Sequence, residues 1–328
     1  MYLENPVLYS PIKLQGIGPG GSNSSGYIRG SIIDGRAVGG DTPYSEWWRE
    51  AFLGDVWNNR GGWDRALMSD PETPFIYEGA VITLFAEAGE FGAGYHAAID
   101  GFIVQGGDQQ GFPNNPMEVG GAVGQQAIVV QGGGIFANGY AQNLQVSNNL
   151  IQSNGGSYGG AIRLGTPHIA EPDASNHNDN VFIGYNRILA NGGTNLAGAI
   201  ALFNGADGYE IAHNDICGNS SIEYGGGISH YGYSPNGEIH HNRIYFNSSY
   251  DEGGGIMIAG ELPADPAVLS VGAGAVDIHH NWIHSNLAND DGGGLRFLMS
   301  GVETYNVFDN IITNNVSTHE GGGVSLND

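Results

Sequence analysis

Apolar and polar residues alternate along the chain in short stretches, separated by turns that are rich in glycine and asparagine. The stretch EIHHNRI (residues 238–244) and the stretch GIMIAG (residues 255–260) are examples. Such alternation is typical of half-buried β-strands, because successive side chains point to opposite faces of a strand. Glycine and asparagine suit the turns, where the backbone takes positive φ. The pattern predicts an all-β chain of many short strands.

The alternation recurs with a period of about 28 residues, lengthened twice by insertions. One half of the repeat reads Asn-x-Ile-x-x-Asn and begins at Asn149, Asn186, Asn214, Asn242, Asn281 and Asn310. The other half reads Gly-Gly-Gly/Ala-Ile, or a close variant, and begins at Gly132, Gly159, Ala197, Gly225, Gly253, Gly292 and Gly321. A unit this short has no core of its own and buries its apolar residues only by stacking on its neighbours.

Stacked units of short strands, all wound in one direction, make every strand pair parallel, and parallel crossovers are right-handed. We therefore predict a single domain over residues 1–328, a right-handed parallel β-helix of about nine to ten coils with loop insertions. The asparagines that begin each repeat are expected to form a hydrogen-bonded ladder along it. The chain stops inside a repeat, which suggests a fragment of a longer parent protein.

Residues 43–75 interrupt the pattern and contain Trp47, Trp48, Trp57 and Trp63. We expect this aromatic-rich insertion to pack against the coil or to cap its open β edge. An aromatic platform for sugars or for a partner is the alternative.

The repeats resemble those of the right-handed parallel β-helices of the pectin-lyase-like superfamily, from about residue 98 to residue 328. The GGAI and x-x-x-Asn halves are also similar to repeats of polymorphic outer-membrane adhesins. The resemblance implies the fold more than an activity, since this fold hosts lyases, hydrolases and adhesins. The chain lacks the Gly-His-Gly and Arg-Ile-Lys motifs of polygalacturonases, and its arginines do not assemble the pattern of pectate lyases.

The formal net charge of −24 excludes most nucleic-acid partners, because the chain repels phosphate backbones. The one cysteine, Cys217, excludes an intramolecular disulfide and a thiolate zinc cluster. No apolar run is long enough for direct membrane insertion. The first residues of this expected fragment, Met-Tyr-Leu-Glu-Asn-Pro, lack the basic and apolar regions of a signal peptide. No organic cofactor is indicated.

Acidic residues stand directly before the glycine triplets of the last three repeats. The predicted catalytic carboxylates are Glu252, Asp291 and Glu320. The predicted metal ligands are Asp251, Glu252, Asp290, Asp291 and Glu320. Stacked carboxylates repel unless a cation or a hydrogen-bond donor compensates them, so we expect calcium, an acid/base pair or a solvated acidic corner.

The two insertions, near residues 166–178 and 260–275, fall at the same corner of the predicted coil. Between them, short corners leave room for a groove that admits an extended glycan. The predicted substrate-binding residues are Asp207, Tyr209, Glu210, His230, Tyr231, Tyr233 and Glu238. Ordinary variation in loop length is the alternative.

Histidines recur directly before the ladder asparagines, at His213, His241 and His280, and His240 and His279 precede the last two. Rings that stack on one another explain this repetition. Imidazoles at the strand spacing of ~5 Å could also hold zinc or copper, or respond to pH.

From these observations we expect an extracellular or cell-surface domain, a secreted scaffold or adhesive segment with polysaccharide as its candidate partner. The alternative is a polysaccharide-degrading enzyme, a glycoside hydrolase rather than a lyase, that uses the stacked carboxylates.

Overall fold

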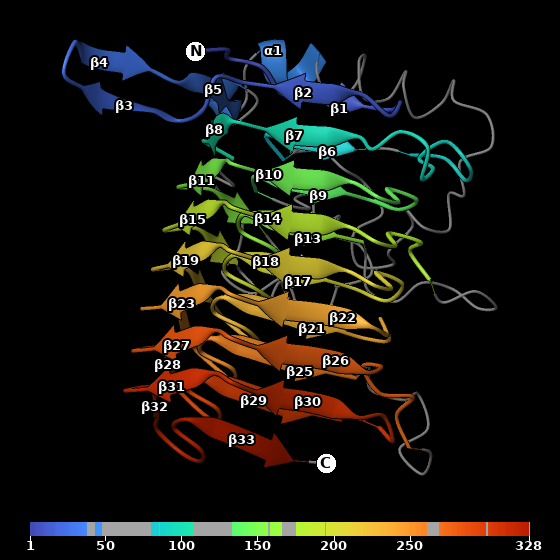
Figure 1. Ribbon diagram of the computed structural model, residues 1–328, viewed down its shortest axis with the longest axis vertical. Helices are drawn as coiled ribbons and strands as arrows, with labels where there is room; N and C mark the ends of the chain where they lie inside the picture. The colour runs from blue at the N-terminus through green and yellow to red at the C-terminus, as the bar shows by residue number, and fades with distance from the viewer. Residues whose placement is uncertain are drawn as a thin grey trace.

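The computed structural model describes residues 1–37, 43–47, 80–84, 86–107, 133–156, 158–165, 175–193, 195–260, 269–299 and 301–327. Successive coils stack along the long axis of the molecule, with the N-terminus at one end of the stack and the C-terminus at the other (Figure 1). Most of the aromatic-rich insertion predicted at 43–75 lies outside these residues. Its described part is the short helix α1 (Pro43–Glu46) and Trp47, and a 3-10 turn, η1 (Gly35–Ala37), comes before it.

Each regular coil contributes one strand to each of four parallel sheets, which we number I to IV in chain order and whose strands we count within the described ranges. Sheet I holds nine strands: β1 (Val7–Leu8), β6 (Ile82–Leu84), β9 (Ile135–Ala137), β13 (Ile162–Leu164), β17 (Ile200–Leu202), β21 (Ile228–Tyr231), β25 (Ile256–Ala259), β29 (Leu295–Leu298) and β33 (Val324–Asn327). Sheet II holds eight: β2 (Lys13–Gln15), β7 (Ala98–Asp100), β10 (Gln145–Ser147), β14 (Phe182–Gly184), β18 (Glu210–Ala212), β22 (Gly237–His240), β26 (Val276–His279) and β30 (Tyr305–Phe308).

The remaining strands form the other two sides of the coil and one hairpin. Sheet III holds β5 (Ser31–Asp34), β8 (Phe102–Gln105), β11 (Leu150–Gln152), β15 (Arg187–Leu189), β19 (Asp215–Cys217), β23 (Arg243–Tyr245), β27 (Trp282–His284) and β31 (Ile311–Thr313). Sheet IV holds β12 (Gly155–Gly156), β16 (Gly192–Gly193), β20 (Ser220–Ser221), β24 (Ser248–Ser249), β28 (Leu287–Ala288) and β32 (Val316–Ser317). An antiparallel hairpin, β3 (Gly20–Asn23) with β4 (Gly26–Arg29), projects from the N-terminal end of the stack (Figure 1).

The predicted all-β, parallel β-helix architecture is therefore confirmed, and equivalent repeat positions pair in register. Ile216 of β19, for example, lies beside Ile188 of β15 and Ile244 of β23. These isoleucines point into the coil and are fully buried. Together with the inward residues of sheets I and II they form one continuous apolar core along the axis. Among the described residues, no helix is long and apolar enough to cross a membrane.

The glycine triplet is required by the close approach of successive coils. Gly225 takes a φ of 72°, which suits glycine. A Cβ on Gly226 would lie 2.5 Å from the carbonyl oxygen of Gly254, and a Cβ on Gly227 would lie 2.5 Å from that of Gly255. Larger side chains would therefore push neighbouring coils apart.

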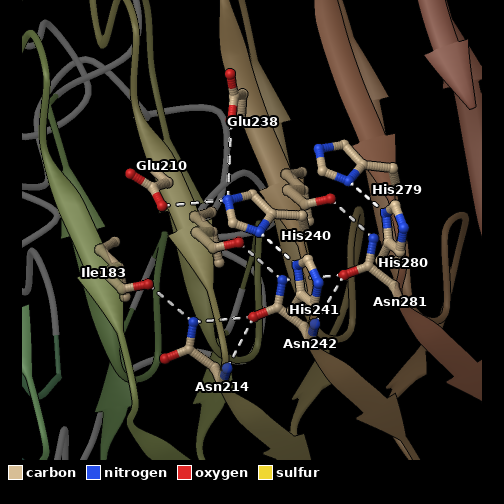
Figure 2. A network of polar contacts seen from close by, with 12 residues as sticks. Ile183, Glu210, Asn214, Glu238, His240, His241, Asn242, His279, His280 and Asn281 are labelled. Carbon is tan, nitrogen blue, oxygen red and sulfur yellow. Dashed lines mark hydrogen bonds and ion pairs between the residues drawn. The ribbon is translucent and has the colours of Figure 1, made fainter.

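The predicted asparagine ladder is confirmed, and its bonding is the same in each coil. The backbone N–H and the side-chain Nδ2 of Asn214 both donate to Oδ1 of Asn242, at 2.9 and 3.0 Å. Nδ2 of Asn214 also donates to the carbonyl of Ile183, at 2.8 Å (Figure 2). A second ladder with the same bonding runs through the last asparagine of the motif, at Asn154, Asn191, Asn219, Asn247, Asn286 and Asn315. These bonds satisfy buried polar groups at two corners of the coil.

Candidate functional site

Carboxylates gather where the chain turns into the last strands of sheet I. We call Asp251, Glu252, Asp290, Asp291 and Glu320 the acidic corner. Nη2 of Arg296, on the outer face of β29, lies 3.0 Å from Oε1 of Glu252 and 3.3 Å from Oδ2 of Asp291. The three side chains are 1%, 12% and 7% exposed in that order. The carboxylates of Glu252 and Asp291 are thus paired with a buried guanidinium group of the same chain.

Arg296 provides the donor that stacked carboxylates require, and it was not among the predicted site residues. The alternation in Leu295-Arg296-Phe297 contained the signal, because it turns Arg296 to the outer face of the strand. The four residues between Asp291 and Arg296 are the glycine triplet 292–294, where the chain bends, and Leu295 of β29, and this path brings the two side chains together. The carboxylates of Glu252 and Asp291 thus share one guanidinium nitrogen, and their catalytic role stays a prediction.

The outer part of the acidic corner is more open to solvent. Burial, reinforced by Glu252 and Asp290, raises the pKa of the Asp251 carboxyl to about 6. Nδ1 of His319 lies 3.0 Å from Oδ1 of Asp291 and 3.2 Å from Oδ1 of Asp290. The hydrogen bond to Asp291 raises the pKa of His319.

Glu320 contacts the rest of the acidic corner through its backbone N–H, which donates to Oδ1 of Asp291 at 2.8 Å. Its side chain is exposed in the last coil. Asp290, Asp291 and His319 offer ligand atoms within 4.8 Å of one another. Calcium binding at the acidic corner stays a prediction.

Residues 166–174 and 261–268, which make up most of the predicted groove walls, lie outside the described residues. Of the predicted substrate-binding residues, Tyr233 and Glu238 are exposed, and Asp207 and Glu210 are partly exposed. Tyr231 is also partly exposed and packs edge-on against Phe203 at a ring-centroid distance of 6.3 Å.

Tyr209 and His230 instead lie inside the coil, 1% and 0% exposed, and cannot contact a glycan on the surface. Their assignment to the groove is therefore corrected. His230 follows Ser229 in β21, so the alternation that turns Ser229 outward turns His230 inward. Nε2 of His230 donates to the carbonyls of Gly232 and Ala273, at 2.9 and 3.0 Å. Nδ1 then accepts from the Tyr209 hydroxyl at 2.9 Å, which makes His230 a neutral imidazole in the core.

The histidines at the corner between sheets II and III stack as expected (Figure 2). The ring centroids of His241 and His280 are 4.9 Å apart, and those of His240 and His279 are 5.0 Å apart, with nearly parallel planes. His213 extends the first row at 4.9 Å from His241. We call these five residues the histidine cluster.

An exposed aromatic surface on sheet III was missed by the sequence analysis. We call Arg243, Tyr245, Phe246, Trp282 and His284 the aromatic face. The Arg243 guanidinium lies 4.1 Å from the ring centroid of Tyr245 and 4.9 Å from that of Trp282. His284 stacks on Tyr245 at 5.1 Å and contacts Trp282 at 4.3 Å.

Phe246 and Trp282 remain 61% and 44% exposed, although their neighbours on the aromatic face hold one another in place. The residue after the first asparagine of each motif points outward on sheet III, so the sequence contained the signal for Arg243 and Trp282. Tyr245 and His284 follow two residues later on the same strands, so the alternation places them on the same face. No signal in the sequence indicated the direction of Phe246, which follows β23 in a turn. Single exposed aromatics are common, whereas a cluster of them around a stacked arginine is a candidate recognition surface.

Comparison with protein-family models, with curated proteins and with solved structures finds no match to this chain.

Proposed function

We propose that this chain is a non-catalytic, extracellular β-helix scaffold that binds polysaccharide, and that the aromatic face is its binding surface. The exposed rings of Phe246 and Trp282 are the observation that carries the proposal. Trp282 lies beside the stacked Arg243, and Phe246 packs against Tyr245 and His284. Aromatic rings offer apolar faces to sugar rings, while the guanidinium offers donors to hydroxyl groups.

The sheet beneath the aromatic face supports binding because it is already ordered. β23 and β27 are adjacent in-register strands, with Arg243 beside Trp282 and Tyr245 beside His284. Side chains on such strands repeat at the strand spacing of ~4.8 Å along the coil axis. A surface that needs no rearrangement loses little entropy when an extended ligand binds.

The acidic corner gives less support to an enzyme. The pairing of Glu252 and Asp291 with Arg296 has the geometry of an ion-pair network that stabilises the turn. Polysaccharide degradation by Glu252, Asp291 and Glu320 therefore remains the second candidate function.

The resemblance of the repeats to the pectin-lyase-like superfamily and to outer-membrane adhesins favours a secreted or cell-surface setting. The strongly acidic composition agrees with a soluble surface that repels polyanions unless a cation bridges them. Calcium at the acidic corner would supply such a bridge, and a lower melting temperature after chelation would support it.

Affinity electrophoresis through gels that contain different polysaccharides tests the proposal. We expect at least one neutral or acidic polysaccharide to retard the wild-type protein. The double variant Phe246→Asn, Trp282→Thr should lose most of this retardation, by about tenfold in apparent affinity, because both exposed rings are removed. Asparagine tolerates the φ of 54° at position 246, and threonine suits an outward strand position.

Tyr185→Asn is the matched control for this double variant. Tyr185 is also 56% exposed and has a φ of 60°, but it lies at the corner between sheets II and III. Equal retardation of the wild type and the double variant, or selective loss in Tyr185→Asn, would show that the aromatic face does not bind the polysaccharide.

A further inference from the structure

The histidine cluster brings imidazoles from three successive coils to one corner of the molecule, and Figure 2 shows the pairs of two of these coils, His240–His241 and His279–His280. His213 follows β18, His240 ends β22, and His241 follows it directly. His279 and His280 repeat the second arrangement one coil further along. Three of the residues, His213, His241 and His280, have φ between 54° and 59°. The positive φ of His241 and of His280 directs each ring toward the histidine that precedes it in the chain, His240 or His279.

The paired rings face each other through the same ring nitrogen. Nδ1 of His240 lies 2.9 Å from Nδ1 of His241, and Nδ1 of His279 lies 2.8 Å from Nδ1 of His280. Two imidazole nitrogens on one tetrahedral zinc ion, each at about 2.0–2.1 Å, are separated by about 3.3 Å. Each pair therefore needs to open by only about half an ångström to hold one ion between its rings.

A third imidazole completes one of these sites. His213, His240 and His241 offer ligand nitrogens that all lie within 4.8 Å of one another. His213 and His241 are exposed and His240 is partly exposed, so an ion can enter from solvent. Three protein ligands leave a position on the ion for water or another ligand.

Carboxylates lie near Nε2 of the imidazoles, the nitrogen on the opposite side of the ring from the converging Nδ1 atoms. Hydrogen-bond acceptors commonly occupy this position next to metal-binding histidines. Nε2 of His240 lies 3.1 Å from Oε1 of Glu210 and 3.8 Å from Oε2 of Glu238. Nε2 of His280 lies 3.8 Å from Oδ2 of Asp309. A carboxylate that holds the proton on Nε2 leaves the lone pair on Nδ1, where the rings of a pair converge. The same carboxylates make the surroundings favourable to a cation.

The neutral form of imidazole is the one that binds metal. Binding requires no net loss of a proton from a neutral pair, because the proton between the two Nδ1 atoms can move to the free Nε2 of one ring through solvent.

We infer that His213, His240 and His241 form a binding site for a divalent transition-metal ion of the zinc and copper group. The pair His279–His280 forms a second, weaker half-site on the same corner. Imidazole ligands with carboxylates behind them select these ions over calcium or magnesium, which prefer oxygen ligands. The site is independent of the polysaccharide-binding proposal, which uses side chains of sheet III.

Isothermal titration of the metal-free protein with zinc chloride tests the inference, with electron paramagnetic resonance of bound Cu²⁺ as the second measurement. We expect one tight binding step and a weaker one, and a Cu²⁺ spectrum with splitting from imidazole nitrogens. His241→Asn should weaken the tight step at least tenfold, and Glu210→Gln should weaken it by about tenfold. His280→Asn should remove the weaker step and keep the tight one.

His177→Asn is the matched control, because His177 also has a φ of 54° and stacks on a tyrosine, at 4.9 Å from Tyr140. It should bind zinc as the wild type does. His319→Gln separates the histidine cluster from the acidic corner and should also leave the tight step intact. The inference is overturned if His319→Gln removes that step, if His241→Asn retains it, or if the wild type does not bind zinc.

Discussion

At the residue scale, the interior of the coil accepts a polar group where the fold supplies every partner. His230 occupies a position of sheet I that carries Leu202 in one neighbouring coil and Ile258 in the other. Both ring nitrogens are hydrogen-bonded, and burial lowers the pKa of His230 to about 4. The alternation in the sequence was sufficient to place this residue inside. Its partner Tyr209 directly precedes β18 and alternates with Glu210 and Ile211, so it also points into the coil.

His230→Leu should lower the free energy of unfolding by about 2–4 kcal/mol, because the Tyr209 hydroxyl and two carbonyls lose a buried partner. Adding Tyr209→Phe should recover part of this loss, since it removes the unpaired hydroxyl. Urea unfolding of the two single variants and the double variant measures both effects. Equal stability of His230→Leu and the wild type would contradict the buried network.

Asp251 should make the protein less stable as the pH rises. Its folded pKa of about 6 exceeds the ordinary value of 3.8, so between these values the folded state binds more protons than the unfolded state. The free energy of unfolding therefore falls as pH increases through this range.

Asp251→Asn removes this titration and should be more stable than the wild type above pH 6, by about 1 kcal/mol after solvent screening. The two proteins should have similar melting temperatures near pH 4. Calorimetry across this pH range would detect the difference, and a constant offset at all pH values would refute the assignment.

At the element scale, the two asparagine ladders join coils more specifically than the apolar core does. Asn219 accepts from the backbone N–H and Nδ2 of Asn191, and it donates to the Ile188 carbonyl at 3.0 Å. The first ladder could be predicted because its asparagines share one repeat position. The last asparagine of each motif also recurs at one repeat position, so the second ladder could have been predicted in the same way.

Asn219→Ala should lower the free energy of unfolding by about 2–4 kcal/mol, because it leaves a buried N–H and a buried carbonyl unpaired. Asn315→Ala, in the less buried last coil, should have a smaller effect, since solvent reaches the groups it exposes. Ser220→Ala, at an exposed position next to Asn219, is the control and should have little effect. Thermal unfolding of the three variants gives this order, and equal losses for all three would contradict it.

At the scale of the whole molecule, the period of the sequence determines almost everything about the fold. Regular spacing from about residue 133 onward places each isoleucine over the one before it, and this could be predicted without a structure. The aromatic face and the acidic corner could not be predicted completely. They combine outward residues of a strand with residues of a turn, and the direction of a side chain in a turn does not follow from a period. The association of Arg296 with Glu252 is of this kind.

Retention on polysaccharide and release of new reducing ends, measured on the same sample, test the central proposal of a binding scaffold most directly. We expect the wild-type protein to be retained without producing reducing ends, and the double variant Phe246→Asn, Trp282→Thr to lose the retention. New reducing ends from the wild type that disappear in Glu252→Gln or Asp291→Asn would contradict the proposal and identify an enzyme.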